Sequence, residues 1–376
     1  MISVFNELEK IRDSSPILLN DISSNRYTIH CQESNGAKIA YCFSVPIRNI
    51  NTKGIVDLRF YHNKQGSIFQ GSEAKITIAN HVRLLNSYGH CDVAFQGNLT
   101  KKTDRAAFLK SNMHHIEICP TLNGIKLMFN CAIPSDPPSI KLRLDRTFET
   151  IRFNNKYFSV MREKFIPFIT VSCIGVINEH GKVVAPCEIH NQKITNFEYN
   201  LTFRPLNKAQ GRIAIEINMQ ETKLFQDTTV ESNHPTMNNA FGGVAFLGTS
   251  KAFGEQWLYS RLEMAHIAQL QRKKITKCIL HIPVLGYNTA PVTVNRISER
   301  FCSFRSNWEN KIAITNAISD ASYSNGYYHI DITKFLGNLR EKSKNFVIKT
   351  NATSKPVVIP TGDSFCSPLI LEVRYQ

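Results

Sequence analysis

The sequence predicts an all-β fold of tandem antiparallel β-sandwich domains, jelly-roll-like in arrangement, with a short helix at the N-terminus. Short runs of alternating apolar and polar residues recur along most of the chain, and glycines punctuate the loops between them. Only two short segments have the spacing of a helix. A length of 376 residues exceeds one ordinary core and indicates two or three domains, and 42% hydrophobic residues is typical of a folded protein.

Residues 1–24 are interpreted as a helical arm, with an amphipathic helix over 3–13 that ends before Pro16. The apolar residues that recur near helical spacing in this helix are Val4, Phe5, Leu8 and Ile11. A helix of three turns is marginal on its own, so its apolar face needs a surface to cover. Two surfaces are equally compatible with the sequence: the arm's own domain, or a neighbouring subunit on which these residues would dock.

Residues 25–136 are predicted to form the first β-sandwich. Within 55–62, the apolar residues Val56, Leu58 and Phe60 alternate with a second set, which indicates a strand with one buried face. Further strand-like runs occupy 37–47, 74–79, 115–122 and 125–133. Short strands separated by turns favour a sandwich or barrel over an α/β arrangement.

A proline-rich segment over 134–139 is the best candidate for a linker, because Pro137 and Pro138 cannot donate ladder hydrogen bonds. Beyond it, strand-like runs continue over 139–144, 165–177, 195–203 and 211–219. In the last two runs apolar residues occupy every second position, so each strand carries an apolar face. The sequence leaves open whether 137–222 is a small β domain or an extension of the first sandwich.

The last predicted domain, 223–376, contains an ordered series of motifs. They are DTTVES (227–232), NNAFGG (238–243), WLYSRLEM (257–264), ITKCILHIPV (275–284), FCSFRSNWE (301–309), HIDITKFL (329–336) and PTGDSFCSPLILEVRY (360–375). The helical spacing of 331–340 lies in this series, and Asp331 or Thr333 can cap the first turn of a short helix there.

This series of motifs resembles the DNRLRE-type β-sandwich module. The resemblance implies a jelly-roll-like, non-catalytic module of surface and carbohydrate-associated proteins, some of whose relatives bind acidic polysaccharides such as alginate. It also implies that Asp331 to Thr333 end a strand and begin a helix, and that Trp308 is a packing residue. The first 220 residues resemble the companions of such modules more weakly.

The motif at 257–264 supplies the most specific binding hypothesis. As a strand it places four side chains on one face, namely Trp257, Tyr259, Arg261 and Glu263. Aromatic rings beside an arginine can stack a sugar and pair an acidic group, or the same face can pack under a loop or against the middle domain. A second aromatic group beside a turn has the same two interpretations and consists of Tyr323, Tyr327 and Tyr328.

No catalytic residue, metal site or cofactor is predicted. The sequence contains no G-x-S-x-G elbow, Walker A loop, H-E-x-x-H motif or Rossmann fingerprint. Adjacent potential ligands such as His114 and His115 would point to opposite faces of a strand, which argues against a shared metal ion. A pair of carboxylates that meets only in the folded protein is not excluded by the sequence.

Cysteine usage and charge restrict the environment and the partners. The ten cysteines are scattered without a C-x-x-C pair, which favours buried free thiols in a reducing compartment over zinc sites or disulfides. The net charge of +15 fits an anionic polysaccharide or an acidic partner protein. The basic residues form no long stripe, and RNA-binding signatures are absent, which argues against nucleic acid.

No apolar run is long enough to span a bilayer, and the charged N-terminal segment lacks the pattern of a secretory leader. We therefore expect synthesis in the cytoplasm, with a virion, an injection-type particle or a cell surface as the final site. The expected function is that of a non-enzymatic structural or adhesive protein that assembles with copies of itself or with other structural subunits, as in a tail fibre, capsid decoration or appendage. The alternative is a glycan-binding module for an anionic polysaccharide, and the third class is a polysaccharide-acting enzyme.

Overall fold

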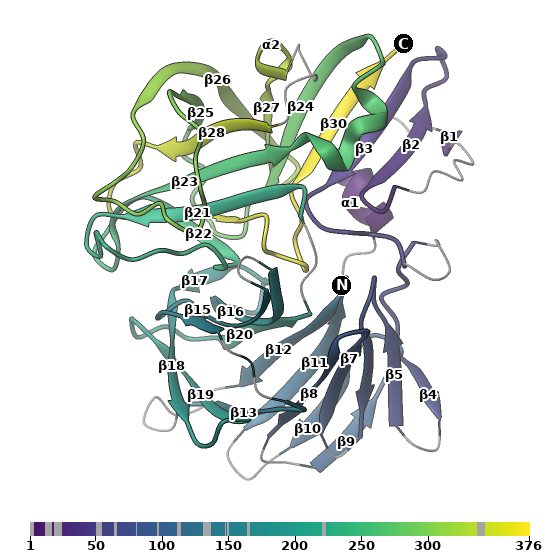
Figure 1. Ribbon diagram of the computed structural model, residues 1–376, viewed down its shortest axis with the longest axis vertical. Coiled ribbons are helices and arrows are strands. Elements are labelled where there is room, and N and C mark those ends of the chain that lie inside the picture. Colours follow the sequence, from purple (N-terminus) through teal and green to yellow (C-terminus); the bar gives the residue numbers. More distant parts are fainter. Residues whose placement is uncertain are drawn as a thin grey trace. The chain divides into compact units, whose positions relative to one another are not determined.

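The computed structural model confirms the all-β class, with 57% of residues in strands and 5% in helices. It describes residues 4–11, 17–18, 25–49, 55–63, 66–79, 81–95, 98–110, 114–130, 137–146, 148, 150–163, 166–219, 223–336 and 343–376. The chain forms two compact units (Figure 1). The inserted unit is Asn49–Glu221, and the terminal unit combines Ile2–Arg48 with Thr222–Gln376.

The terminal unit is built on a thirteen-stranded antiparallel sheet. In spatial order its strands are β1 (Ile17–Leu18), β2 (Thr28–Gln32), β3 (Lys38–Phe43), β30 (Ile370–Tyr375), β24 (Ile275–Pro283), β27 (Tyr327–Asp331), β26 (Ile314–Ser324), β25 (Val292–Ile297), β28 (Ser343–Thr350), β23 (Gly254–Glu263), β22 (Val244–Ser250) and β29 (Val357–Pro360), with β21 (Phe225–Glu231) paired to β23. Strands from distant places in this order contribute to one buried apolar cluster, as Ala40 of β3, Leu258 of β23 and Ile348 of β28 show. The sheet therefore closes around its own core, as a sandwich does.

The structure divides the chain differently from the boundaries expected from sequence. Strands β2 and β3 lie in the predicted first sandwich, 25–136, yet β3 pairs with β30 along its whole length, from Lys38 opposite Tyr375 to Phe43 opposite Ile370. The alternation within a strand indicates which face is buried but not which strand it pairs with. The rest of 25–136 shares one unit with 137–222, which corresponds to the alternative in which the second segment extends the first.

The inserted unit contains two antiparallel sheets. The first has the order β14 (Thr150–Phe153), β15 (Tyr157–Glu163), β16 (Ile166–Ile177), β20 (Arg212–Asn218), β12 (Gly124–Asn130), β11 (His115–Thr121), β10 (Ala107–Lys110) and β9 (Asn98–Lys102), with β17 (Val183–Ala185) on β16. The second has the order β18 (Cys187–Lys193), β19 (Glu198–Pro205), β13 (Ser139–Leu144), β8 (Gly89–Ala94), β7 (Val82–Asn86), β6 (Lys75–Ile78), β5 (Gly66–Gln70) and β4 (Tyr61–Asn63). Ring contacts join the two sheets, for example Phe129 of β12 with Phe203 of β19 at 6.1 Å between centroids.

Two strand predictions in the inserted unit are modified. The strand expected over 55–62 is confined to Tyr61–Asn63, although Val56 and Phe60 are buried as the alternation indicated. Strand β20 buries both faces, since Ala214 on the second face is also fully covered. A central strand flanked by neighbours on both sides is covered more completely than its polar residues suggest.

Both expected helices are present within the described residues. Helix α1 is Val4–Ile11, α2 is Thr333–Leu336, and a 3-10 helix, η1, covers Met264–Leu270. The cap of α2 is confirmed, because the Thr333 backbone N–H and hydroxyl both donate to the Asp331 carboxylate, at 2.9 and 2.5 Å. Within the described residues, no helix is long and apolar enough to cross a membrane.

The arm belongs to the terminal unit. Leu8 is 2% exposed, and Ile11 lines a pocket together with strands β3, β24 and β30, so these side chains are covered by the chain itself. The side chains of Val4 and Phe5 lie outside the described ones. Nine of the cysteines lie in described residues, and all nine are free thiols.

Candidate functional site

The face predicted for sugar stacking on β23 is largely covered. The alternation is as expected, with Leu258 and Leu262 in the core and Tyr259 on the opposite face. Tyr259, however, is fully buried, and its hydroxyl donates to the carbonyl of Ile312 at 2.7 Å. Residues of the segment after β25, among them Phe301, pack over this face. The interpretation in which the face packs under a loop therefore applies to Tyr259.

Arg261 is occupied by partners from its own unit. Its guanidinium donates to Glu263 at 2.5 Å, to the carbonyl of Phe301 at 3.1 Å, and to the side-chain oxygen of Gln226. Its side chain is only 13% exposed. The Arg261 and Glu263 side chains thus neutralise each other and leave little capacity for an acidic ligand.

Trp257, at the end of the same face, is only half-buried and meets Trp308 with ring centroids 5.2 Å apart. These are the only two tryptophans in the sequence. The ammonium of Lys311 lies 4.0 Å from the Trp308 ring centroid and 5.8 Å from that of Trp257, and the Lys349 ammonium lies 5.7 Å from Trp257. We call Trp257, Trp308, Lys311 and Lys349 the tryptophan–lysine patch. Trp308 also packs against the buried cluster around Tyr259, as the resemblance implied. Nothing in the linear spacing pairs the two tryptophan rings.

The second aromatic group is mostly internal. Tyr327 and Tyr328 are 2% and 1% exposed, and the Tyr328 hydroxyl donates to the carbonyl of Ala290 at 2.7 Å. Only Tyr323 is open to solvent, at 45% exposure. The predicted turn is an Asn-Gly hairpin turn with positive φ at both central residues, as type I′ geometry requires.

The terminal unit also contains a polar pocket of about 370 Å³ that no sequence motif indicated. Its walls are formed by α1 and by β3, β30, β24 and β27, and Figure 1 shows α1 beside β2 and β3. His281 and His329 occupy directly opposite positions on β24 and β27, with 2.7 Å between their Nδ1 atoms. The Nε2 atom of His281 lies 3.2 Å from the Glu372 carboxylate, and Nε2 of His329 lies 2.9 Å from the Ser324 hydroxyl. We call this the histidine pocket.

Glu372 is the carboxylate that contacts His281 in the histidine pocket. Burial raises the pKa of this carboxyl, but hydrogen bonds and positive charge from His281 and Arg374 outweigh burial and hold that pKa below its usual range. Arg374 donates to Glu372 at 2.6 Å and also lies 3.4 Å from Glu33. Glu372 is therefore an anion at neutral pH. The described residues contain no group of histidine, cysteine and acidic side chains arranged to hold a metal ion.

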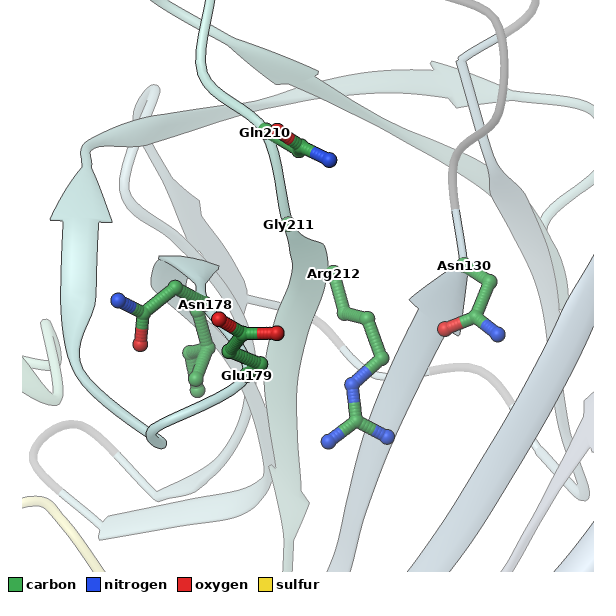
Figure 2. A pocket seen from close by; sticks show the side chains of 7 residues that line it. Asn130, Asn178, Glu179, Gln210, Gly211 and Arg212 are labelled. Atoms are coloured by element: carbon green, nitrogen blue, oxygen red, sulfur yellow. The ribbon is translucent and has the colours of Figure 1, made fainter.

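The inserted unit contains a larger cavity, of about 470 Å³ (Figure 2). Figure 2 shows the Arg212 side chain between Asn130 and Glu179. The Arg212 guanidinium pairs with Glu117 at 2.6 Å. The cavity thus offers amide groups and a paired arginine, and none of the side chains that line it is aromatic.

No protein-family model matches the chain, and no curated protein matches it. The resemblance to DNRLRE-type modules therefore stays a prediction from the motif series. The tryptophan–lysine patch and the histidine pocket are the two candidate sites of the terminal unit.

Proposed function

We propose that the protein is an adhesive protein whose terminal unit binds an anionic polysaccharide through the tryptophan–lysine patch. The observation that carries this proposal is the meeting of both tryptophans with two lysine ammonium groups on one half-buried surface. The proposed binding surface shares Trp257 with the face predicted from the sequence. Its other members are Trp308 and two lysines instead of Tyr259 and Arg261.

The chemistry of the patch suits a sugar acid. A pyranose ring presents C–H groups that pack against the face of an indole, and a uronate carboxylate pairs with an ammonium group. Lys311 and Lys349 already lie within reach of the rings, so one sugar residue can contact a ring and an ammonium group together. The net charge of +15 attracts a polyanion at long range.

Titration calorimetry against a polyuronate and a neutral glucan tests the proposal. We expect the double variant Lys311→Gln, Lys349→Gln to bind the polyuronate about tenfold more weakly, a loss of about 1.4 kcal/mol, because two charge pairs are removed. Lys251→Gln removes an exposed lysine of the same unit and serves as the matched control. Equal affinity of the wild type and the double variant, or tighter binding of the neutral glucan, would contradict the proposal.

A second candidate function is assembly into a surface or phage-like structure through the inserted unit. Seven of the nine exposed large hydrophobic side chains in the described residues belong to this unit: Tyr61, Leu85, Tyr88, Phe153, Val184, Ile194 and Phe197. Exposed apolar side chains favour contact with copies of the same chain or with other structural subunits.

Size-exclusion chromatography with light scattering tests this second candidate. We expect oligomers whose fraction rises with protein concentration, and a shift toward monomer in Ile194→Ser, Phe197→Ser. Tyr287→Ser, which changes an exposed aromatic residue of the terminal unit, is the control. A wild type that remains monomeric at every concentration would exclude self-assembly.

A further inference from the structure

The histidine pocket contains a continuous chain of hydrogen-bonding groups that runs from a buried carboxylate to an exposed hydroxyl. Glu372 and His281 are each 2% exposed, whereas Ser324 at the other end is open to solvent. The three links measure 3.2 Å from Glu372 to His281, 2.7 Å from His281 to His329, and 2.9 Å from His329 to Ser324. Four strands contribute to it, since Glu372 is on β30, His281 on β24, His329 on β27 and Ser324 at the end of β26.

The ionised Glu372 determines how protons are arranged along this chain when both imidazoles are neutral. A carboxylate only accepts, so Nε2 of His281 carries a proton and donates to Glu372. The Nδ1 atom of His281 is then an acceptor, so Nδ1 of His329 must be the donor in the 2.7 Å contact. This leaves Nε2 of His329 as an acceptor for the Ser324 hydroxyl. The arrangement orients His329 as a base that faces a serine.

We propose that Ser324 and His329 form a nucleophile and general-base pair that hydrolyses short acyl esters of polar molecules, with His281 and Glu372 as positioning residues. A nucleophilic serine needs a base within hydrogen-bond distance and a third group that orients the base, and each is present here. The adjoining pocket of about 370 Å³ falls within the size range of small-molecule sites. Asn325 lines the same pocket next to Ser324 and carries an amide that can donate to an oxyanion.

The reaction balances with water as the only co-reactant. The Ser324 oxygen bonds to the ester carbonyl carbon while its proton passes to Nε2 of His329. The bond from that carbon to the alcohol oxygen then breaks, and the alcohol leaves with the proton from His329. Water attacks the acyl-serine and gives a proton to His329, and release of the carboxylic acid returns that proton to Ser324.

A proton added to His281 reverses the direction of the hydrogen bonds, so that Nε2 of His329 can no longer accept the Ser324 proton. With both nitrogens of His281 protonated, Nδ1 of His281 donates to His329, and Nε2–H of His329 donates to Ser324, whose carbonyl also lies 3.3 Å away. Hydrolysis is therefore expected to rise with pH as this added proton is lost. The charged and titratable groups that line the pocket around the two histidines are Lys10, Glu33, Tyr41, Lys277, Glu372 and Arg374, and the Tyr327 ring also packs against His329.

Two measurements test the proposal on the full chain: labelling by a fluorophosphonate probe, and hydrolysis of p-nitrophenyl acetate and of an acetylated polyuronate. We expect labelling at Ser324 and an activity that falls at least about 100-fold in Ser324→Ala. Ser322→Ala is the matched control, because Ser322 lies on the same strand and bonds only the backbone carbonyl of His329. It should retain both labelling and turnover.

The positioning residues are tested by the pH profile. His281→Gln and Glu372→Gln are expected to lower kcat about tenfold or more and to move the acid limb of the profile, whereas a purely structural role would leave the limb in place. Absence of labelling in the wild type, or equal turnover in Ser324→Ala, overturns the proposal. Failure of this proposal can be distinguished from failure of the proposed polysaccharide binding, because the Lys311 and Lys349 variants that test binding leave Ser324 unchanged.

Discussion

The two units are made of the same kind of antiparallel strands but distribute their polar groups differently. The terminal unit buries charged and titratable side chains, including His281 and Glu372 on its sheet and Asp363 in the segment between β29 and β30. The inserted unit contains most of the exposed large hydrophobic side chains of the described residues, and its cavity is lined by amides and an arginine paired with Glu117. Buried polar groups cost free energy unless they are satisfied, so their concentration in one unit supports the binding and hydrolysis proposed for that unit. Exposed apolar groups in the other unit support the assembly proposed for it.

The largest expected effect on stability comes from placing a charge in the core of one unit at a time. Ala40→Asp puts a carboxylate in the core of the terminal unit, and Ala214→Asp does the same in the inserted unit, since both alanines are fully buried. We expect each variant to lower the free energy of unfolding of its own unit by about 3–5 kcal/mol, because an unpaired buried charge is strongly destabilising.

Tryptophan fluorescence distinguishes the two outcomes, because both tryptophans lie in the terminal unit. The fluorescence transition in urea should shift in Ala40→Asp and stay in place in Ala214→Asp, while circular dichroism reports a loss in both. A fluorescence shift of equal size in the two variants would show that the chain unfolds as a single unit. No shift in Ala40→Asp would show that β3 is not part of the terminal core.

The sequence predicted which faces of strands are buried better than it predicted which strands meet. The alternation of Tyr199, Leu201 and Phe203 identified the buried face of β19, and these side chains are 4% exposed or less. The pairing of β3 with β30 joins opposite ends of the chain. No local pattern encodes such a pairing, because backbone hydrogen bonds in a ladder do not depend on side-chain identity.

The binding residues show the same limit. The alternation of 257–264 correctly placed Trp257 and Tyr259 on one face, but it could not indicate that Phe301 and its neighbours cover Tyr259. His281 and His329 come from separate motifs and look ordinary in each. They become a pair only because the register of β24 and β27 sets them opposite each other.

The smallest effect concerns a second buried cluster of the terminal unit. Burial raises the pKa of Asp227 well above its usual range, and the neighbouring Asp363 carboxylate raises it further, against the opposing charge of Lys223. The folded unit therefore binds the Asp227 proton more tightly than the unfolded chain does. Its contribution to stability is complete below the ordinary aspartate range, near pH 4, and is lost as pH rises through the raised pKa.

Asp227→Asn removes this loss while keeping an oxygen that can accept the hydrogen bond from the Gly362 backbone N–H. At pH 8 we expect the melting temperature of the terminal unit to rise by about 2–4 °C, the size that corresponds to about 1 kcal/mol, and at pH 4 we expect no gain. Thermal unfolding followed by tryptophan fluorescence at the two pH values measures the difference. Glu216→Gln, which alters a buried carboxyl of the inserted unit, should leave this pH dependence unchanged. If Asp227→Asn lowers the melting temperature at pH 8, the ionised Asp227 carboxylate stabilises the terminal unit. That result would contradict the expectation that this buried charge lowers its stability.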